Sequence, residues 1–145
     1  AVYAMDWPYR QQITPQNGRD VLLNNAIRFR GYDVDLTQSD QLSLTLYWES
    51  VEPVSDNNKV FIHLLDDAGN IVAQLDRPPA DGLAPTDLWQ SGDLIRDQYA
   101  IALPPNLPAG TYRLQVGMYS DENGRLTAPD TPDGVIFLTE WEQSP

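Results

Sequence analysis

The sequence predicts an all-β protein, an antiparallel β-sandwich of two sheets built from seven or eight strands. Three observations lead to this prediction. Apolar and polar residues alternate over several short stretches, which is the period of a half-buried strand. Between these stretches lie most of the 12 prolines and 9 glycines, the residues that turns require. No stretch has the 3.6-residue period of an amphipathic helix. We expect an immunoglobulin-like topology, with a jelly roll as the alternative.

The length and charge limit what the chain can be. Its 145 residues fit one domain, 1–145, which starts with an irregular lead-in over residues 1–18. The formal charge of −12 comes from 21 acidic against 9 basic residues, and such a surface repels phosphate backbones. Nucleic acid is therefore not an expected partner.

Neither disulfide nor membrane chemistry is expected within this chain. It contains no cysteine. The longest apolar run, residues 135–138, is far shorter than the ~20 residues that a membrane-spanning helix needs. We therefore expect no membrane insertion within the chain. It begins with Ala1 rather than methionine, as a mature product or a piece of a longer protein would.

The first half of the chain supplies the first predicted strands. Residues 20–35 form one or two strands with an interruption at Asn24-Asn25, where a turn or bulge is favourable. Residues 42–48 alternate regularly. Residues 59–66 are more continuously apolar, as in a central strand, and a turn containing Gly69 joins them to residues 70–76 in a hairpin.

The second half begins with a long connection, residues 77–92, rich in proline and glycine. Loops of this length are either packed by their own side chains or functional. We expect Leu83 and Trp89 to anchor it. In the following strand, residues 93–103, Asp97 shares the inward face with apolar neighbours. A strand at 110–119 and a last one at 134–141 complete the sandwich.

Three polar residues are expected to have structural roles. Tyr112 follows a Pro-x-Gly turn at the start of a strand, as in the tyrosine corner of immunoglobulin-like domains. An inward-facing carboxylate is costly unless it is hydrogen-bonded. We therefore expect Asp97 or Asp76 to accept hydrogen bonds from backbone amides of residues 77–92, or to pair with an arginine.

Catalytic and metal-binding patterns are not found. His63 is the only histidine, with no cysteine to complete a zinc site, and we interpret it as a hydrogen-bonded or sheet-surface imidazole. A glycoside hydrolase needs two carboxylates, and no pair is singled out. Residues 66–70 and 121–123 carry oxygen ligands that suit calcium, but the same residue types are what tight turns require. No catalytic residue, metal ligand or cofactor is predicted.

Three aromatic residues are the candidate ligand-binding positions. Trp89 lies in the long connection, and Tyr47 and Tyr119 have the outward parity of their strands. Aromatic rings of this kind can stack on sugars, because they combine a large apolar face with a polar group. The alternative for Trp89 is that it plugs one end of the sandwich.

Several linked segments resemble one bacterial domain. They are Tyr47-Trp48, VFIHLLDDAGNIVAQLDRPP (60–79), Gly82, Pro85-Thr86, Trp89, Gly92, Asp97-x-Tyr99 and LPAGTYRLQVGMY (107–119). Together they resemble the soluble C-terminal portion of membrane glycosyltransferases of the dolichyl-phosphate-mannose protein mannosyltransferase type, found in Chloroflexus-like bacteria. The resemblance covers residues 31–119. It implies a non-catalytic β-sandwich outside the membrane, because the catalytic acids of the transferase would lie in loops that are absent here.

The expected function follows from this resemblance and from the missing catalytic patterns. We expect a non-catalytic accessory or binding domain, extracytoplasmic and part of a membrane-anchored glycosyltransferase-like parent, with a glycan or cell-envelope polymer as its ligand. The alternative is a structural or protein-interaction domain whose exposed sheet edges pair with a protein partner. A glycoside hydrolase is the weaker alternative.

Overall fold

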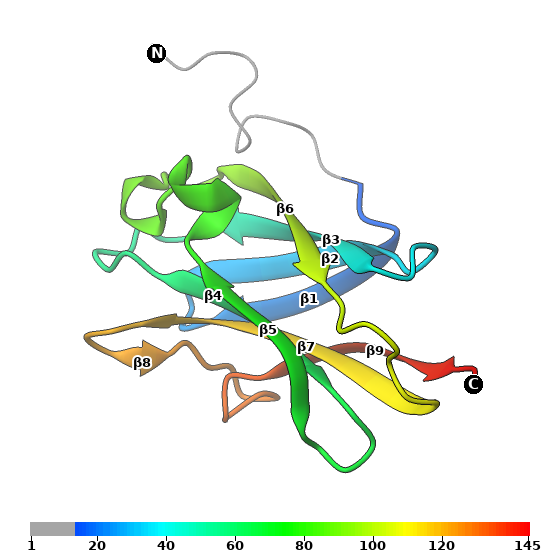
Figure 1. Ribbon diagram of the computed structural model, residues 1–145. Coiled ribbons are helices and arrows are strands. Elements are labelled where there is room, and N and C mark those ends of the chain that lie inside the picture. Colours follow the sequence, from blue (N-terminus) through cyan, green and yellow to red (C-terminus); the bar gives the residue numbers. More distant parts are fainter. Residues whose placement is uncertain (1–13) are drawn as a thin grey trace.

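The computed structural model describes residues 14–145, which form two antiparallel sheets (Figure 1). The first sheet has the strand order β1-β2-β3-β6. In the second, the order is β5-β4-β7, and β8 and β9 pair with different ends of β7. The strands are β1 (Asn17–Leu23), β2 (Ile27–Asp35), β3 (Gln41–Ser50), β4 (Lys59–Leu65), β5 (Ile71–Arg77), β6 (Leu94–Ala102), β7 (Gly110–Ser120), β8 (Gly124–Arg125) and β9 (Ile136–Gln143).

The two antiparallel sheets confirm the predicted β-sandwich, and their strand order agrees with the expected immunoglobulin-like topology. The chain passes from one sheet to the other between β3 and β4, between β5 and β6, and between β6 and β7. These crossings place β6 beside β3 and β7 beside β4, as in immunoglobulin-like domains. The tyrosine corner is also present, because the Tyr112 hydroxyl donates a hydrogen bond to the Pro108 carbonyl at 2.6 Å.

The core lies between the two sheets and follows the alternation in the sequence. Each central strand directs every second side chain inward, where it is buried against the opposite sheet. The largest fully buried side chains come from six strands: Trp48, Phe29, Leu23, Ile27, Leu42, Leu44, Leu46, Ile62, Leu64, Ile95, Leu114 and Met118. The inward faces are therefore used for packing, and a ligand site must lie on an outer face, in a loop or at an end of the sandwich.

The structure differs from the sequence prediction in the number and limits of its strands. Nine strands lie in the described residues, whereas at most eight were expected. The additional strand is β8, which is only two residues long and has no alternating pattern. Strand β1 begins at Asn17, inside the expected lead-in, and residues 1–13 of that lead-in lie outside the described range. The predicted interruption at Asn24-Asn25 is a turn in which both residues have positive φ.

The connection between β5 and β6 contains two short 3-10 turns, η1 (Pro79–Gly82) and η2 (Thr86–Leu88). Figure 1 shows them grouped in green at one end of the sandwich. No helix in residues 14–145 is long and apolar enough to cross a membrane.

Candidate functional site

The outer face of the five-stranded sheet carries a hollow whose floor depends on a glycine. Phe61 on β4 lies opposite Gly117 on β7. A Cβ atom at Gly117 would lie 2.4 Å from the Phe61 ring, so the ring occupies the space that a side chain would fill. Although Phe61 points away from the core, it is only 2% exposed.

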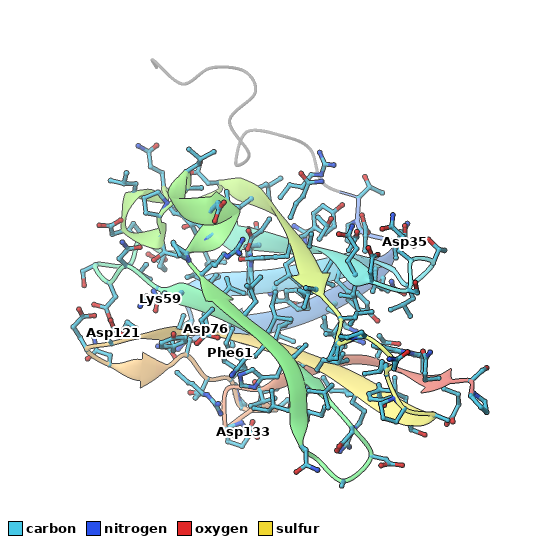
Figure 2. The ribbon with its side chains drawn as sticks, viewed as in Figure 1. Asp35, Lys59, Phe61, Asp76, Asp121 and Asp133 are labelled. Atoms are coloured by element: carbon cyan, nitrogen blue, oxygen red, sulfur yellow. The ribbon has the colours of Figure 1, made fainter. Side chains whose placement is uncertain are left out.

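Polar side chains from four strands surround this ring. His63 lies 4.9 Å and Tyr119 6.4 Å from Phe61, between ring centroids, and the Arg125 guanidinium lies 4.7 Å above the ring. Asp76 on β5 completes the rim, and Figure 2 shows it close to Phe61. The hollow has a volume of about 330 Å³ and is lined by Phe61, His63, Asp76, Tyr119, Gly124 and Arg125. We call it the sheet-face hollow.

The sheet-face hollow combines hydrogen-bond donors with a carboxylate acceptor. The Tyr119 hydroxyl donates to the Asp76 carboxylate at 3.0 Å. Burial raises the pKa of Tyr119, and the hydrogen bond and charge of Asp76 raise it further. Burial lowers the pKa of His63, against the opposing charge of Asp76, so the imidazole is neutral at pH 7. A ligand would therefore meet a carboxylate, a guanidinium, a neutral imidazole and a phenol.

A second tyrosine–aspartate pair lies on the other sheet. The Tyr47 hydroxyl donates to Asp33 at 2.5 Å, and burial followed by this hydrogen bond raises the pKa of Tyr47. Tyr47 is buried, so its ring offers little surface for stacking. This placement does not favour the predicted ligand-binding role of Tyr47, whereas Tyr119 does lie in a hollow.

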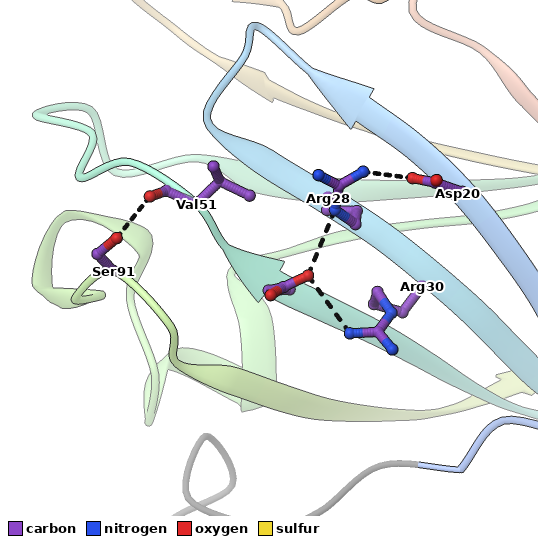
Figure 3. A network of polar contacts seen from close by, with 6 residues as sticks. Asp20, Arg28, Arg30, Val51 and Ser91 are labelled. Atoms are coloured by element: carbon purple, nitrogen blue, oxygen red, sulfur yellow. Dashed lines mark hydrogen bonds and ion pairs between the residues drawn. The ribbon is translucent and has the colours of Figure 1, made fainter.

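Charged groups on β1, β2 and β3 of the same sheet are paired with one another (Figure 3). Arg28 and Arg30 each lie 3.3 Å from the same Glu49 oxygen, and Arg28 also contacts Asp20. Such partly exposed pairs contribute little to stability. They do give each of these four charged groups a partner.

Trp89 is an anchor of the long connection and is not available for stacking. It is 2% exposed, and its indole N–H donates to the Ala84 carbonyl at 2.9 Å. The predicted stacking role of Trp89 is therefore wrong for this structure, and the plug alternative describes it. The prediction that Leu83 is a second anchor is also wrong, because Leu83 is 66% exposed.

The Asp97 carboxylate is buried, as its inward parity in the sequence predicted. Its Oδ1 accepts a hydrogen bond from the Ala80 amide of the long connection at 2.7 Å, as predicted. Its Oδ2 accepts from the Tyr99 hydroxyl at 2.6 Å and from the Trp48 indole N–H at 3.2 Å. Burial raises the pKa of Asp97 to about 6, although the three hydrogen bonds oppose this shift. Asp97 lies in the core, so its role is structural; Asp76 is exposed instead and belongs to the sheet-face hollow.

The acidic turns behave as turns. Asp66 accepts hydrogen bonds from the amides of Ala68 and Asn70, which holds the pKa of this carboxyl below its usual value. Asp121 lies 3.6 Å from Lys59. Among the described residues, no group of three or more His, Cys, Asp or Glu is placed to hold a metal ion.

Sequence reasoning did not assign Phe61, His63 and Arg125 to one site. His63 is on the sheet surface, in line with its interpretation from the sequence. Tyr119 and Arg125 reach the same hollow from β7 and β8, and alternation within a strand gives no register between strands that are far apart in the chain. The available signal was weak: the aromatic Phe61 and the glycine Gly117 both have outward parity on predicted strands.

Comparison with known proteins gives no functional assignment. No protein-family model matches the chain, and no curated protein matches it. A solved structure described as Northeast Structural Genomics Consortium target SoR45 is 12% identical, with 84% of this chain and 89% of that chain covered and a TM-score of 0.32. A likeness this low carries no argument about function.

Proposed function

We propose that this chain is a non-catalytic accessory domain that binds a glycan or cell-envelope polymer through the sheet-face hollow. The observation that carries the proposal is the meeting of Tyr119, Asp76 and Arg125 over the buried Phe61 ring. Sugar hydroxyls both donate and accept hydrogen bonds, so a carboxylate and a guanidinium that line the same hollow suit them. The rings of Tyr119 and His63 add apolar surface for the C–H groups of a sugar.

The composition of the hollow supports a binding role over hydrolysis. Glycosidases flank the scissile bond with two carboxylates about 5–10 Å apart. Among the described residues that line the hollow, Asp76 is the single carboxylate. Binding therefore requires no further group, whereas hydrolysis would require a second acid.

The resemblance of residues 31–119 to the soluble portion of membrane glycosyltransferases supports the proposed setting. In that setting the domain is extracytoplasmic and belongs to a membrane-anchored parent, where it holds the glycan or polymer on which the parent acts. The charge of −12 fits this ligand class, because a neutral glycan is not repelled by an acidic surface as a phosphate backbone is.

The test compares two chemically identical substitutions on opposite sheets. Asp76→Asn and Asp33→Asn each remove the charge of an aspartate that accepts a tyrosine hydroxyl. The ¹⁵N-labelled protein is titrated with neutral and uronate-containing envelope oligosaccharides. We expect Asp76→Asn to weaken binding by about 10-fold or more, since a charge-assisted hydrogen bond contributes roughly 1.5–3 kcal/mol, and Asp33→Asn to leave it unchanged. Equal affinities of the wild type and both variants would rule out the sheet-face hollow.

A protein-interaction domain is the second candidate, because one observation favours it. Leu83 and Leu88 are 66% and 62% exposed at the end of the sandwich formed by the long connection. Contiguous exposed apolar surface commonly marks an interaction site, and these two side chains belong to one short connection. If no oligosaccharide binds, and Leu83→Ser with Leu88→Ser abolishes co-purification with the parent's remaining segments, this second function replaces the first.

A further inference from the structure

A second hollow lies at one end of the sandwich. It shares no lining residue with the sheet-face hollow. It is formed where residues 36–40, residues 103–107 and the end of β9 meet, and its volume is about 700 Å³. Ligand pockets commonly have volumes of ~300–1,000 Å³. We call it the end hollow; its lining includes Leu103, Leu107, Trp141, Asp40, Asn106 and Gln143. In Figure 1 the turn between β2 and β3 and the end of β9 both lie at the right, away from β8.

The indole of Trp141 is held in position by the tyrosine corner. Trp141 on β9 lies opposite Tyr112 on β7, with ring centroids 6.1 Å apart and planes inclined by 31°. Tyr112 is in turn fixed by its hydrogen bond to Pro108. Trp141 is only partly buried, so a positioned aromatic ring is available at the mouth of the sandwich.

The walls of the end hollow are also fixed by hydrogen bonds. The Leu103 amide donates to the Asp40 carbonyl at 2.9 Å, which ties the end of β6 to the turn after β2. In that turn, Asp35 accepts from the amide and the hydroxyl of Thr37 at 2.9 and 2.6 Å. The Tyr32 hydroxyl donates to the Leu138 carbonyl at 2.8 Å and links β2 to β9. A site held in this way binds with a smaller ordering cost.

The lining of the end hollow selects a neutral, hydroxylated ligand. Its apolar part is made of leucines, prolines and Trp141, and its polar part is made mainly of carboxamides and hydroxyls, which donate and accept as sugar hydroxyls do. Asp40 carries the one acidic side chain among the described lining residues, and none of these has a basic side chain. An anionic ligand would therefore find no cation here and would be repelled by the protein's net charge.

We propose that the end hollow is a second glycan-binding site, in which a neutral sugar unit stacks on Trp141. The choice of ligand class rests on the proposed function, whereas the site itself is separate from the sheet-face hollow. Two sites at different places on one domain would let it contact two sugar units of one polymer or two chains at once, which raises the overall avidity.

The test follows Trp141 directly in the intact chain. Uniformly ¹⁵N-labelled protein is titrated with cellotriose, maltotriose and mannotriose, and the indole N–H signals are assigned with single Trp→Phe variants. We expect the Trp141 signal to shift with at least one trisaccharide while those of Trp48 and Trp89, whose N–H groups donate to internal acceptors, stay in place. Trp141→Ala should weaken this binding by about 10-fold, a factor typical of one aromatic contact.

Phe137→Ala is the matched control, because Phe137 is a second partly exposed aromatic on β9 that lies outside the end hollow. Gln143→Ala, a change on the rim, tests the site without altering an aromatic contact. Shifts confined to the surroundings of Tyr119 and Asp76 would overturn this inference while supporting the proposed function. Shifts at Trp141 with 1-hexanol but with no trisaccharide would also overturn it, since the hollow would then select apolar ligands. No shift at either hollow would overturn both proposals.

Discussion

The Asp97 carboxylate holds the amide of Ala80 at 2.7 Å, and Ala80 has a left-handed backbone with φ of 52°. Asp81, the next residue, is left-handed as well. This conformation is unfavourable for residues other than glycine, by about 1–2 kcal/mol each. A buried side chain of β6 thus stabilises an otherwise unfavourable turn in the connection between β5 and β6.

We expect Asp97→Ala to lower the free energy of unfolding by about 3 kcal/mol at neutral pH. The substitution leaves the donors of Ala80, Trp48 and Tyr99 without their acceptor, at ~1–3 kcal/mol each, and the loss is partly offset because a buried charge is also removed. Urea denaturation measures the change. Asp87→Ala removes an exposed carboxylate of the same connection and should change the value by less than about 0.5 kcal/mol. A similarly small change for Asp97→Ala would contradict the structural role of this carboxylate.

Asp97 should make the protein less stable as the pH rises, which is the opposite of the usual effect of a carboxylate. Its pKa in the folded state is about 6, above the ordinary value of 3.8, so the folded protein holds this proton more tightly than the unfolded chain. The stabilising contribution is therefore complete below about pH 4 and is lost as the pH rises through 6, by roughly 3 kcal/mol in total. Asp66 has the opposite effect, because its pKa is lowered in the folded state. Its stabilising contribution is present above its ordinary pKa and is lost as the pH falls below that value.

The measurement for this pH prediction compares the wild type with Asp97→Asn, which cannot titrate at this position. The stability of the wild type relative to Asp97→Asn should be greatest near pH 4 and should fall toward pH 7. A carboxyl ¹³C titration provides a direct check. An Asp97 signal that titrates below pH 4 would show that the three hydrogen bonds outweigh burial.

The sequence was sufficient to predict the features that depend on one strand at a time. Alternation predicted the sandwich, and the Pro-x-Gly-Thr-Tyr pattern predicted the corner at Tyr112. The inward parity of Asp97 predicted its hydrogen bond to the long connection. The sequence did not show which of the two expected anchors of that connection is buried, because alternation gives a side chain's direction only within a strand. In the structure Trp89 is buried and Leu83 is exposed.

The candidate sites could be predicted only in part, because both need contacts between distant segments. Tyr119 was found from its parity, but its neighbours Phe61 and Arg125 come from strands whose register the sequence does not contain. The pairing of Trp141 with Tyr112 could not be predicted either, because it depends on the register between β9 and β7. The sheet-face hollow arises where paired strands meet and the end hollow where loops and strand ends meet, and no periodic pattern within one segment records either meeting.

Trp89→Phe should destabilise the protein by roughly 1–3 kcal/mol. The change leaves the Ala84 carbonyl without its indole donor and opens a small cavity around a side chain that is almost fully buried. Thermal or urea denaturation measures the difference. Leu83→Ala in the same connection should change stability by about 0.5 kcal/mol or less, because this side chain is exposed. If both variants lost equal stability, the assignment of Trp89 as the anchor would be wrong.

Gly117→Ala tests the link between the backbone of β7 and the sheet-face hollow. The new Cβ would meet the Phe61 ring and the Gly134 carbonyl, both at 2.4 Å, so the ring must move into the hollow that it now floors. We expect a loss of about 1–3 kcal/mol in the free energy of unfolding, as is usual for overpacking, together with weaker glycan binding. Gly18→Ala is the matched control, because this strand glycine has no heavy atom within 4 Å of the added Cβ. Ring signals of Phe61 that keep their chemical shifts in Gly117→Ala would show that the floor of the hollow does not depend on this glycine.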